Sequence, residues 1–145
     1  MSLKVAIVPV TPFEQNCSIL VCNETQLAAI TDPGGDIPKI LSAIEEMGAI
    51  PEKILLTHGH VDHCAAAKQL AQQLNIPIIG PHQEELFWLD QLAEQSRRFG
   101  ISGGQAFIPD QWLNDGDHVQ VGKTTLNVIH CPGHTPGHVV FYSAE

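Results

Sequence analysis

The sequence has few basic residues and no long apolar run. Its 145 residues include 7 Lys and Arg against 16 Asp and Glu, which gives a formal net charge of −9. Surfaces that bind nucleic acid or anionic membranes need basic patches, so this charge disfavours both kinds of partner. No stretch approaches the ~20 consecutive apolar residues of a membrane span. We therefore expect a folded protein with no nucleic-acid or membrane partner, and the sequence leaves its oligomeric state open.

Paired cysteines are also missing. Cys17, Cys22, Cys64 and Cys131 form no C-x-x-C pair and no dense pattern, which disfavours a structural zinc finger and a disulfide framework. Free cysteines usually behave as small apolar side chains. We expect four free thiols in a reducing compartment, and hence a cytoplasmic protein.

Predicted strands and helices alternate along the chain. Apolar runs between turn residues predict the strands, and apolar side chains at helical spacing predict the helices. This alternation predicts one α/β layered domain over residues 1–145. The predicted strands are 3–10, 17–22, 26–32, 53–57, 76–80, a hairpin in 117–131 and 138–143; the predicted helices are 36–48, 63–75 and 82–100, followed by a loop at Gly103 and Gly104.

The stretch LLTHGHVDHC crowds His58, His60, Asp62 and His63 directly after a predicted apolar strand. His58 and His60 are two residues apart, so an extended backbone points both imidazoles to one side. Asp62 and His63 begin the next helix and can face the same cavity from a second direction. Neutral imidazoles and carboxylates are ligands of zinc, iron and manganese. Four such groups from one turn could not surround one ion tetrahedrally without strain in the turn. We therefore expect two adjacent ions, one held by His58 and His60 and the other by Asp62 and His63.

The stretch HCPGHTPGHVVFYS places His130, His134 and His138 between two predicted strands. His134 is the best candidate for a third ligand of the ion on His58 and His60. Three protein ligands leave an open position, which is typical of a catalytic rather than a structural zinc site.

Structural roles are the alternative for each histidine. A surface turn that happens to be rich in histidine is disfavoured for the first cluster, because the strand carries it to a buried edge where unpaired imidazoles are costly. For His138, a hydrogen bond that orients the loop or a ligand and a purely structural role are equally open. His82, which opens a predicted helix, and His118, in the hairpin, are expected to be structural. His130 stays undecided.

The chain resembles the metallo-β-lactamase superfamily in these same motifs. THGHVDH matches the superfamily signature T-H-x-H-x-D-H, and CPGHTPGH matches its next metal-ligand motif. FEQNCSILVC, DPGGD and WLNDGDHVQVG resemble segments of the single-domain bacterial proteins similar to glyoxalase II, or hydroxyacylglutathione hydrolase. The resemblance covers essentially all 145 residues and implies an α/β fold of the αβ/βα sandwich type.

By this resemblance, His58, His60 and His134 hold the first metal, and Asp62 and His63 hold the second. In the family, an aspartate that bridges both ions and a further histidine come later than the last residue of this sequence. The last predicted strand also has no partner after it. We therefore expect a fragment of a longer protein, which lacks the C-terminal part of the second half of the sandwich.

The resemblance implies a hydrolase that cleaves a thioester such as S-lactoylglutathione with a hydroxide held by one or two zinc ions, or by iron or manganese. Asp62 is expected to steady the water-derived nucleophile and to take its proton. Asp32 either supports the metal loop or is a plain turn aspartate before Pro33. A substrate derived from glutathione is implied by the family alone, and no substrate-binding residue is assigned.

Two alternatives to thioester hydrolysis stay open. One is another hydrolase on the same metal site, such as a lactonase or an ester hydrolase. The other is a truncated, non-catalytic remnant that binds metal. For the 145 residues by themselves we expect at most one tightly held ion and little hydrolysis, because the second set has only two of its protein ligands.

Overall fold

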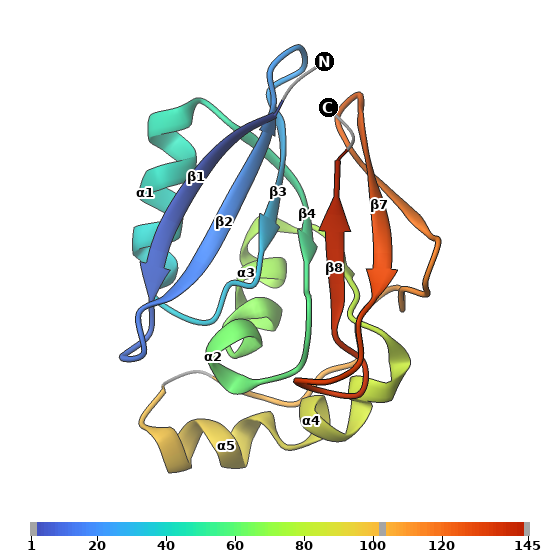
Figure 1. Cartoon of the computed structure of the whole chain (residues 1–145). Helices are drawn as coiled ribbons and strands as arrows, with labels where there is room; N and C mark the ends of the chain where they lie inside the picture. Colours follow the sequence, from blue (N-terminus) through green and yellow to red (C-terminus); the bar gives the residue numbers. More distant parts are fainter. Residues whose placement is uncertain (1–2, 102–103, 144–145) are drawn as a thin grey trace.

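The computed structural model describes residues 3–101 and 104–143 and contains two β-sheets that pack face to face (Figure 1). In sheet A, the first three strands are antiparallel neighbours, and the last three run parallel. Sheet B is antiparallel throughout. In spatial order, sheet A consists of β1 (Leu3–Val10), β2 (Gln15–Cys22), β3 (Leu27–Thr31), β4 (Ile50–Leu55) and β5 (Ile78–Ile79), and sheet B of β6 (His118–Val121), β7 (Thr124–His130) and β8 (Val139–Tyr142).

Helices cover the face of sheet A that points away from sheet B. Of these, α1 contacts β1, and α3 contacts β4 and β5. Three further helices, α2, α4 and α5, lie at the lower end of the molecule in Figure 1, toward which β3 and β4 point. The helices are α1 (Ile37–Met47), α2 (Val61–Cys64), α3 (Ala67–Leu74), the 3-10 helix η1 (Gln83–Glu85), α4 (Leu86–Asp90) and α5 (Leu92–Phe99).

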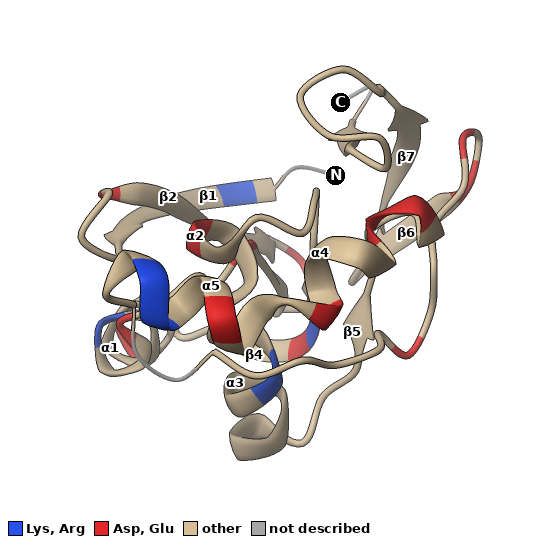
Figure 2. Ribbon diagram, turned by 90° about the horizontal axis from the view of Figure 1, so that it is seen from below, with Lys and Arg blue, Asp and Glu red and all other residues tan. Residues whose placement is uncertain are grey.

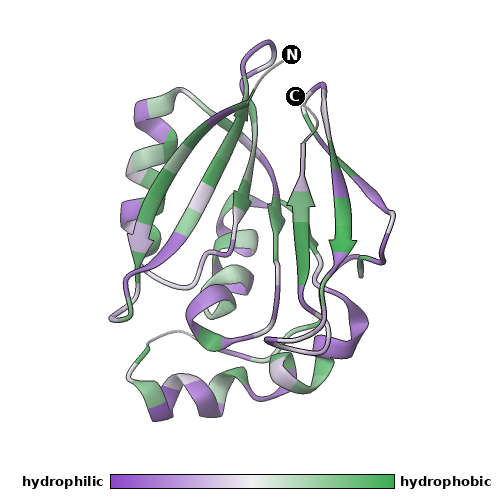
Figure 3. Ribbon diagram, viewed as in Figure 1, coloured by the Kyte–Doolittle hydropathy of each residue, from purple (hydrophilic) through white to green (hydrophobic). Residues whose placement is uncertain are grey.

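Alternate residues of sheet A build two separate cores, because successive side chains of a strand point to opposite faces. Ile30 and Ile54 pack in the core between the sheet and the helices. Their neighbours Ala29 and Leu55 pack in the core between the two sheets, against residues of sheet B such as Val128. Figure 3 shows the resulting apolar strands in both sheets. The layers are therefore helix, sheet, sheet.

Several predicted elements are confirmed. The helix expected at 36–48 is α1, and the expected hairpin is β6 with β7. The last predicted strand is β8, which pairs with β7. Several strand boundaries were wrong. In particular, β4 begins at Ile50 rather than Lys53, because the Ile50 N–H donates to the Gln26 carbonyl at 2.8 Å and extends the strand.

Two predicted helices are each divided in the structure. The helix expected at 63–75 breaks between α2 and α3, where the Ala66 N–H donates to the Pro33 carbonyl at 3.2 Å instead of continuing the helical ladder. The helix expected at 82–100 is divided into η1, α4 and α5. Between α4 and α5, the Gln91 N–H donates to the Trp88 carbonyl at 3.1 Å and forms a tight turn. Gly103, in the predicted glycine-rich loop, lies outside the described residues.

Charged residues lie on sheet A and on the helices, whereas the strands of sheet B contain none. Lys or Arg occurs on β1, α1, β4, α3 and α5, and the short helix α2 carries the acidic residue of the histidine motif, Asp62 (Figure 2). Within residues 3–101 and 104–143, no helix combines the length and the apolarity that a membrane crossing requires.

Two isoleucines of β4 provide a matched test of the core. Ile54 is fully buried, whereas Ile50 is 54% exposed. We expect Ile54→Ala to lower the free energy of unfolding by about 2–5 kcal/mol, because it removes buried methyl groups and leaves a cavity. Ile50→Ala should cost about 1 kcal/mol or less. Urea unfolding of both variants measures the difference, and equal losses would contradict the assignment of Ile54 to the core.

Candidate metal centre

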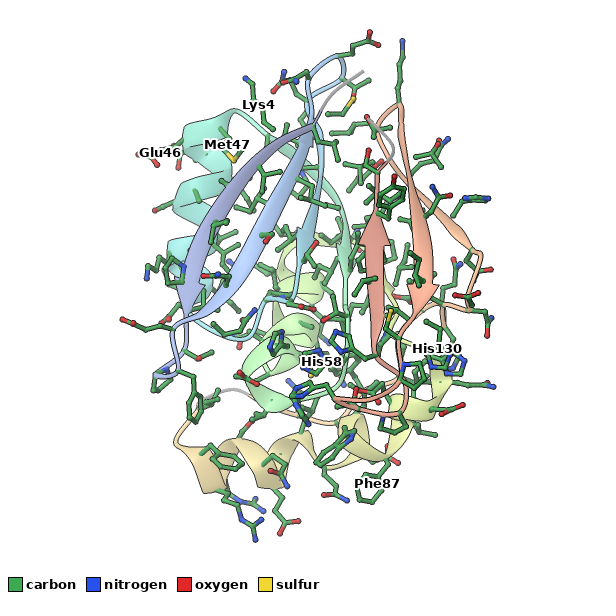
Figure 4. The ribbon with its side chains drawn as sticks, viewed as in Figure 1. Lys4, Glu46, Met47, His58, Phe87 and His130 are labelled. Atoms are coloured by element: carbon green, nitrogen blue, oxygen red, sulfur yellow. The ribbon has the colours of Figure 1, made fainter. Side chains whose placement is uncertain are left out.

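The expected metal-binding residues lie at the carboxyl ends of β3 and β4, where open α/β sheets commonly bind ligands. After β4 ends, His58 and His60 follow in the loop that leads into α2, and Asp62 and His63 lie in α2 itself. Figure 4 labels His58 near the lower end of both sheets. The histidine motif is therefore placed at the edge where the sequence predicts a site.

A second loop, between β7 and β8, brings His134 and His138 to the same place. The Val139 N–H donates to the Thr57 carbonyl at 2.8 Å and fixes the end of this loop against the start of the first one. Two segments that are far apart in the sequence thus lie side by side.

The rings of His58, His60 and His134 converge. One nitrogen from each ring lies within 4.8 Å of a nitrogen of the other two, and the ring centroids are 4.7–5.1 Å apart. His58 is buried, His60 is half-buried and His134 is exposed. The structure brings together the three residues expected for the first ion. Their exposure increases from His58 to His134, so the group extends from the interior to the surface.

The buried carboxylate of Asp32 determines which nitrogen of His58 carries the proton. A carboxylate oxygen accepts hydrogen bonds, so the Thr57 hydroxyl donates to Asp32 Oδ2 at 2.7 Å. The Thr57 oxygen then accepts from His58 Nδ1, 2.9 Å away. His58 Nε2 is left with its lone pair; it is buried, and none of the described residues forms a hydrogen bond with it. An unsatisfied buried acceptor is costly, which is consistent with a position kept for a ligand.

Asp32 orients His63 in the same way. His63 Nδ1 lies 3.0 Å from Asp32 Oδ2 and donates to it. In the neutral form of His63 the proton is therefore on Nδ1, and Nε2 lies 3.8 Å from Asp62 Oδ2. Asp32 also accepts the Thr57 N–H at 2.9 Å. Of the two roles considered for Asp32, these contacts favour support of the metal loop over a plain turn residue.

Burial and neighbouring charges shift the pKa values of these imidazoles in different directions. Burial, with repulsion from neighbouring histidines, lowers the pKa of His58 to about 2. Burial also lowers the pKa of His60 and of His138. For His63, burial acts in the same direction, but the hydrogen bond and charge of Asp32 outweigh it and raise the pKa. His58 is therefore neutral, which is the form that binds metal ions.

The ring of His138 belongs to the same group of histidines. Its centroid lies 4.6 Å from that of His58 and 5.9 Å from that of His134. The His138 carbonyl accepts the Cys131 N–H at 2.8 Å, so this residue also fixes the second loop through its backbone. Whether its ring orients a ligand stays a prediction.

His82 and His130 form a separate pair. Their rings stack with centroids 4.3 Å apart and planes 1° from parallel, and Figure 4 shows His130 away from His58. His82 Nδ1 accepts the Glu84 N–H, and His130 Nε2 donates to the Pro136 carbonyl at 2.9 Å. Their ligand atoms and a Glu84 oxygen lie within 4.8 Å of one another, but parallel stacked rings cannot both aim a lone pair at one ion. We interpret this pair as structural. His118, the other histidine expected to be structural, is exposed at the start of β6.

The cysteines are four free thiols, as expected. Cys17, Cys22 and Cys64 are buried, and Cys131 is exposed. Burial raises the pKa of the Cys17 and Cys64 thiols well above the usual range. These two side chains therefore remain thiols and pack in the core between sheet A and the helices.

A pocket that sequence analysis did not predict adjoins the histidines. It has a volume of about 300 Å³. Trp88, on α4, contacts the His60 ring edge-on with centroids 4.9 Å apart. The rings of Phe13 and Phe99, which also line the pocket, meet edge-on with centroids 6.0 Å apart. Phe13 is far from Trp88 and Phe99 in the sequence, so no local pattern could have grouped all three. The pocket is lined by Phe13, His60, Val61, Asp62, Trp88, Gln95 and Phe99.

The lowered pKa of His58 predicts a pH-dependent stability of the metal-free chain. In the unfolded chain His58 has a pKa of about 6.5, whereas in the folded chain it is lowered to about 2. The stability it contributes is therefore present above pH 6.5 and is lost as the pH falls toward 2. We expect His58→Gln to lose less stability than the parent between pH 7.5 and 5, measured by urea unfolding with a chelator present. His118→Gln is the control, and an identical pH dependence of His58→Gln and the parent would contradict the prediction.

Comparison with known proteins agrees with the fold and the motifs. Residues 10–145 match the metallo-beta-lactamase superfamily. The chain is 41% identical over 144 residues to the hydroxyacylglutathione hydrolase GloC of Haemophilus influenzae, and the match covers 99% of this chain and 68% of that protein.

Two solved structures have a similar fold at 32% identity. One is BLEG-1, a B3 metallo-beta-lactamase, with a TM-score of 0.84 over 97% of this chain and 67% of that one. The other is TTHA1623 in a di-iron-bound form, with a TM-score of 0.83 over 96% of this chain and 67% of that one. The chain thus spans about two thirds of the length of these relatives. Its matched residues and its layered fold show that the chain belongs to the metallo-beta-lactamase superfamily.

Proposed function

We propose that this protein is a metal-dependent hydrolase of the glyoxalase II type, which hydrolyses a thioester. The observation that carries the proposal is the convergence of His58, His60 and His134 from two loops. The buried Nε2 of His58 forms no hydrogen bond with any of the described residues. The similarity to a hydroxyacylglutathione hydrolase supports the thioester class.

The donor set fits a divalent metal ion. Neutral imidazole nitrogens bind zinc, and imidazoles combined with carboxylates also suit iron and manganese. We assign His58, His60 and His134 to the first ion, and Asp62 and His63 to a second. Zinc is our choice for one or both positions, and the di-iron form of a relative makes iron the main alternative.

The protein side chains supply orientation and a proton acceptor. A divalent ion in this position provides Lewis acidity and a water-derived nucleophile near neutral pH. Asp62 is half-buried and lines the pocket next to His60, so its carboxylate can hold a water molecule in the pocket and accept its proton. Asp32 keeps His63 turned toward Asp62. A thiolate is a good leaving group, so no strong general acid is required.

The pocket beside Asp62 suits a small substrate with an apolar part. Phe13, Trp88 and Phe99 offer apolar surface that excludes water, and the Gln95 amide offers a hydrogen-bonding group. We propose that the thioester carbonyl lies toward His60 while its substituent contacts the aromatic rings. A glutathione-derived thioester such as S-lactoylglutathione is the substrate proposed, supported by the name of the relative GloC.

We further propose that residues 1–145 form one domain and that the protein is cytoplasmic. The two cores share sheet A, whose alternate residues belong to one core or the other, which supports a single folding unit. Four free thiols support a reducing compartment.

Zinc content tests the first-metal assignment. We expect about one tightly held zinc ion per chain, since only the first set has three imidazole ligands. His134→Asn should weaken zinc binding by about 100-fold or more, because even outer partners of metal ligands contribute 10–100-fold. His118→Asn, which changes an exposed histidine on β6, is the matched control. Equal zinc affinity of His134→Asn and the control would refute the assignment.

Substrate preference tests the proposed reaction. We expect slow but measurable hydrolysis of S-lactoylglutathione by the zinc-loaded chain, faster than that of lactones or β-lactams. Asp62→Asn should lower kcat by about 100-fold, as expected for a lost proton acceptor, while the first zinc ion is retained. Steady-state kinetics with matched zinc analysis measure both effects. Turnover of lactones or β-lactams without thioester turnover would replace our proposal with another hydrolase of the superfamily.

A further inference from the structure

The side chain of Glu85 is completely buried, with none of its surface exposed. It belongs to η1, the short helix before α4, and its neighbour Glu84 on the same turn is exposed. Burial of a carboxylate is costly unless hydrogen bonds compensate for the lost water. The contacts of Glu85 therefore indicate what its burial achieves.

Each oxygen of this carboxylate accepts one backbone N–H, and the two donors belong to different loops. The Gly59 N–H donates to Glu85 Oε1 at 2.7 Å, and the Gly137 N–H donates to Glu85 Oε2 at 2.8 Å. Gly59 lies between the two histidines of the first loop, and Gly137 lies in the second loop, shortly after His134. One buried carboxylate thus joins the two loops whose imidazoles converge.

Close packing requires glycine at both positions, against Glu85 at Gly137 and against Trp88 at Gly59. A Cβ atom on Gly137 would lie 2.6 Å from Glu85 Cγ, and a Cβ atom on Gly59 would lie 2.8 Å from the Cβ of Trp88. Contacts this short do not occur in folded proteins, so a side chain at either position would displace the neighbouring residue. The second loop is therefore packed closely against η1, and the first loop is packed closely against α4.

We propose that Glu85 is a positioning residue of the metal centre. Its carboxylate fixes the separation of the two loops and so places His58, His60 and His134 before an ion binds. Metal–nitrogen distances tolerate deviations of only about 0.2 Å, so release of either loop weakens the site. This role rests on the proposed function, because it takes the three histidines as metal ligands. Glu85 itself is not proposed as a ligand, since each of its carboxylate oxygens accepts a backbone N–H.

A merely structural role makes a different prediction. A buried carboxylate that only stabilises the fold would lower the stability of the chain when replaced, without changing zinc affinity under conditions where the chain stays folded. Zinc affinity and the local exposure of the two glycine amides are therefore the informative measurements.

Glu85→Gln is the main variant. It keeps the size of the side chain but directs an NH2 group at one of the two N–H donors, so one loop loses its acceptor. We expect faster hydrogen exchange, by at least about 10-fold, at the Gly59 or the Gly137 amide of the metal-free protein, and a loss of zinc affinity of about 10–100-fold. NMR hydrogen exchange and chelator competition measure these effects. Glu84→Gln, which removes the same charge from the exposed neighbour, should change neither.

Glu85→Asp provides a second variant if Glu85→Gln does not fold. It keeps the charge but is too short to reach both amides, so it should show the same two effects. Unchanged exchange at both amides, or faster exchange with unchanged zinc affinity, overturns the positioning role. Absence of zinc binding by the parent chain would instead overturn the proposed function. The exchange measurement would still test whether Glu85 holds the two loops through the Gly59 and Gly137 amides.

Discussion

The hydrogen bond from the Thr57 hydroxyl to the buried carboxylate of Asp32 determines the chemical state of the candidate metal centre. The hydroxyl has one proton, so toward His58 Nδ1 it can only accept, and His58 Nε2 is left with its lone pair. Asp32 also accepts from His63 Nδ1. One carboxylate at the end of β3 therefore fixes the tautomer of one histidine from each expected metal set. Without it, either imidazole could present a proton where a ligand needs a lone pair.

Two buried carboxylates divide the support of the site between them. Asp32 sets which nitrogens of His58 and His63 carry protons, whereas Glu85 holds together the backbones of the loops that carry the histidines. Neither carboxylate forms a hydrogen bond with Nε2 of His58, which stays available to a ligand. Loops placed on a packed scaffold need this kind of support, because the ligands themselves lie outside the regular strands. The helix–sheet–sheet layers supply the rigid edge against which both loops pack.

The candidate ligand residues could be selected from the sequence because their signal is local. His58 and His60 follow an apolar strand at a spacing of two, and His134 lies in a second compact motif. Glu85 could not be predicted, since HQEELFW reads as the acidic first turn of a helix, where a carboxylate is normally solvated; only the crossing of two distant loops buries it. The same limit applies to the fold. The strands were visible as apolar runs, but the break between α2 and α3 depends on a carbonyl of Pro33 from a different part of the chain.

Anomalous diffraction at the zinc edge, from crystals soaked in zinc, most directly tests whether His58, His60 and His134 share one cation. If they do, a peak should lie about 2.0–2.1 Å from one nitrogen of each ring, including Nε2 of His58. A peak bound to His58 and His60 with His134 turned away, or a peak located instead beside His82 and His130, would contradict the shared site.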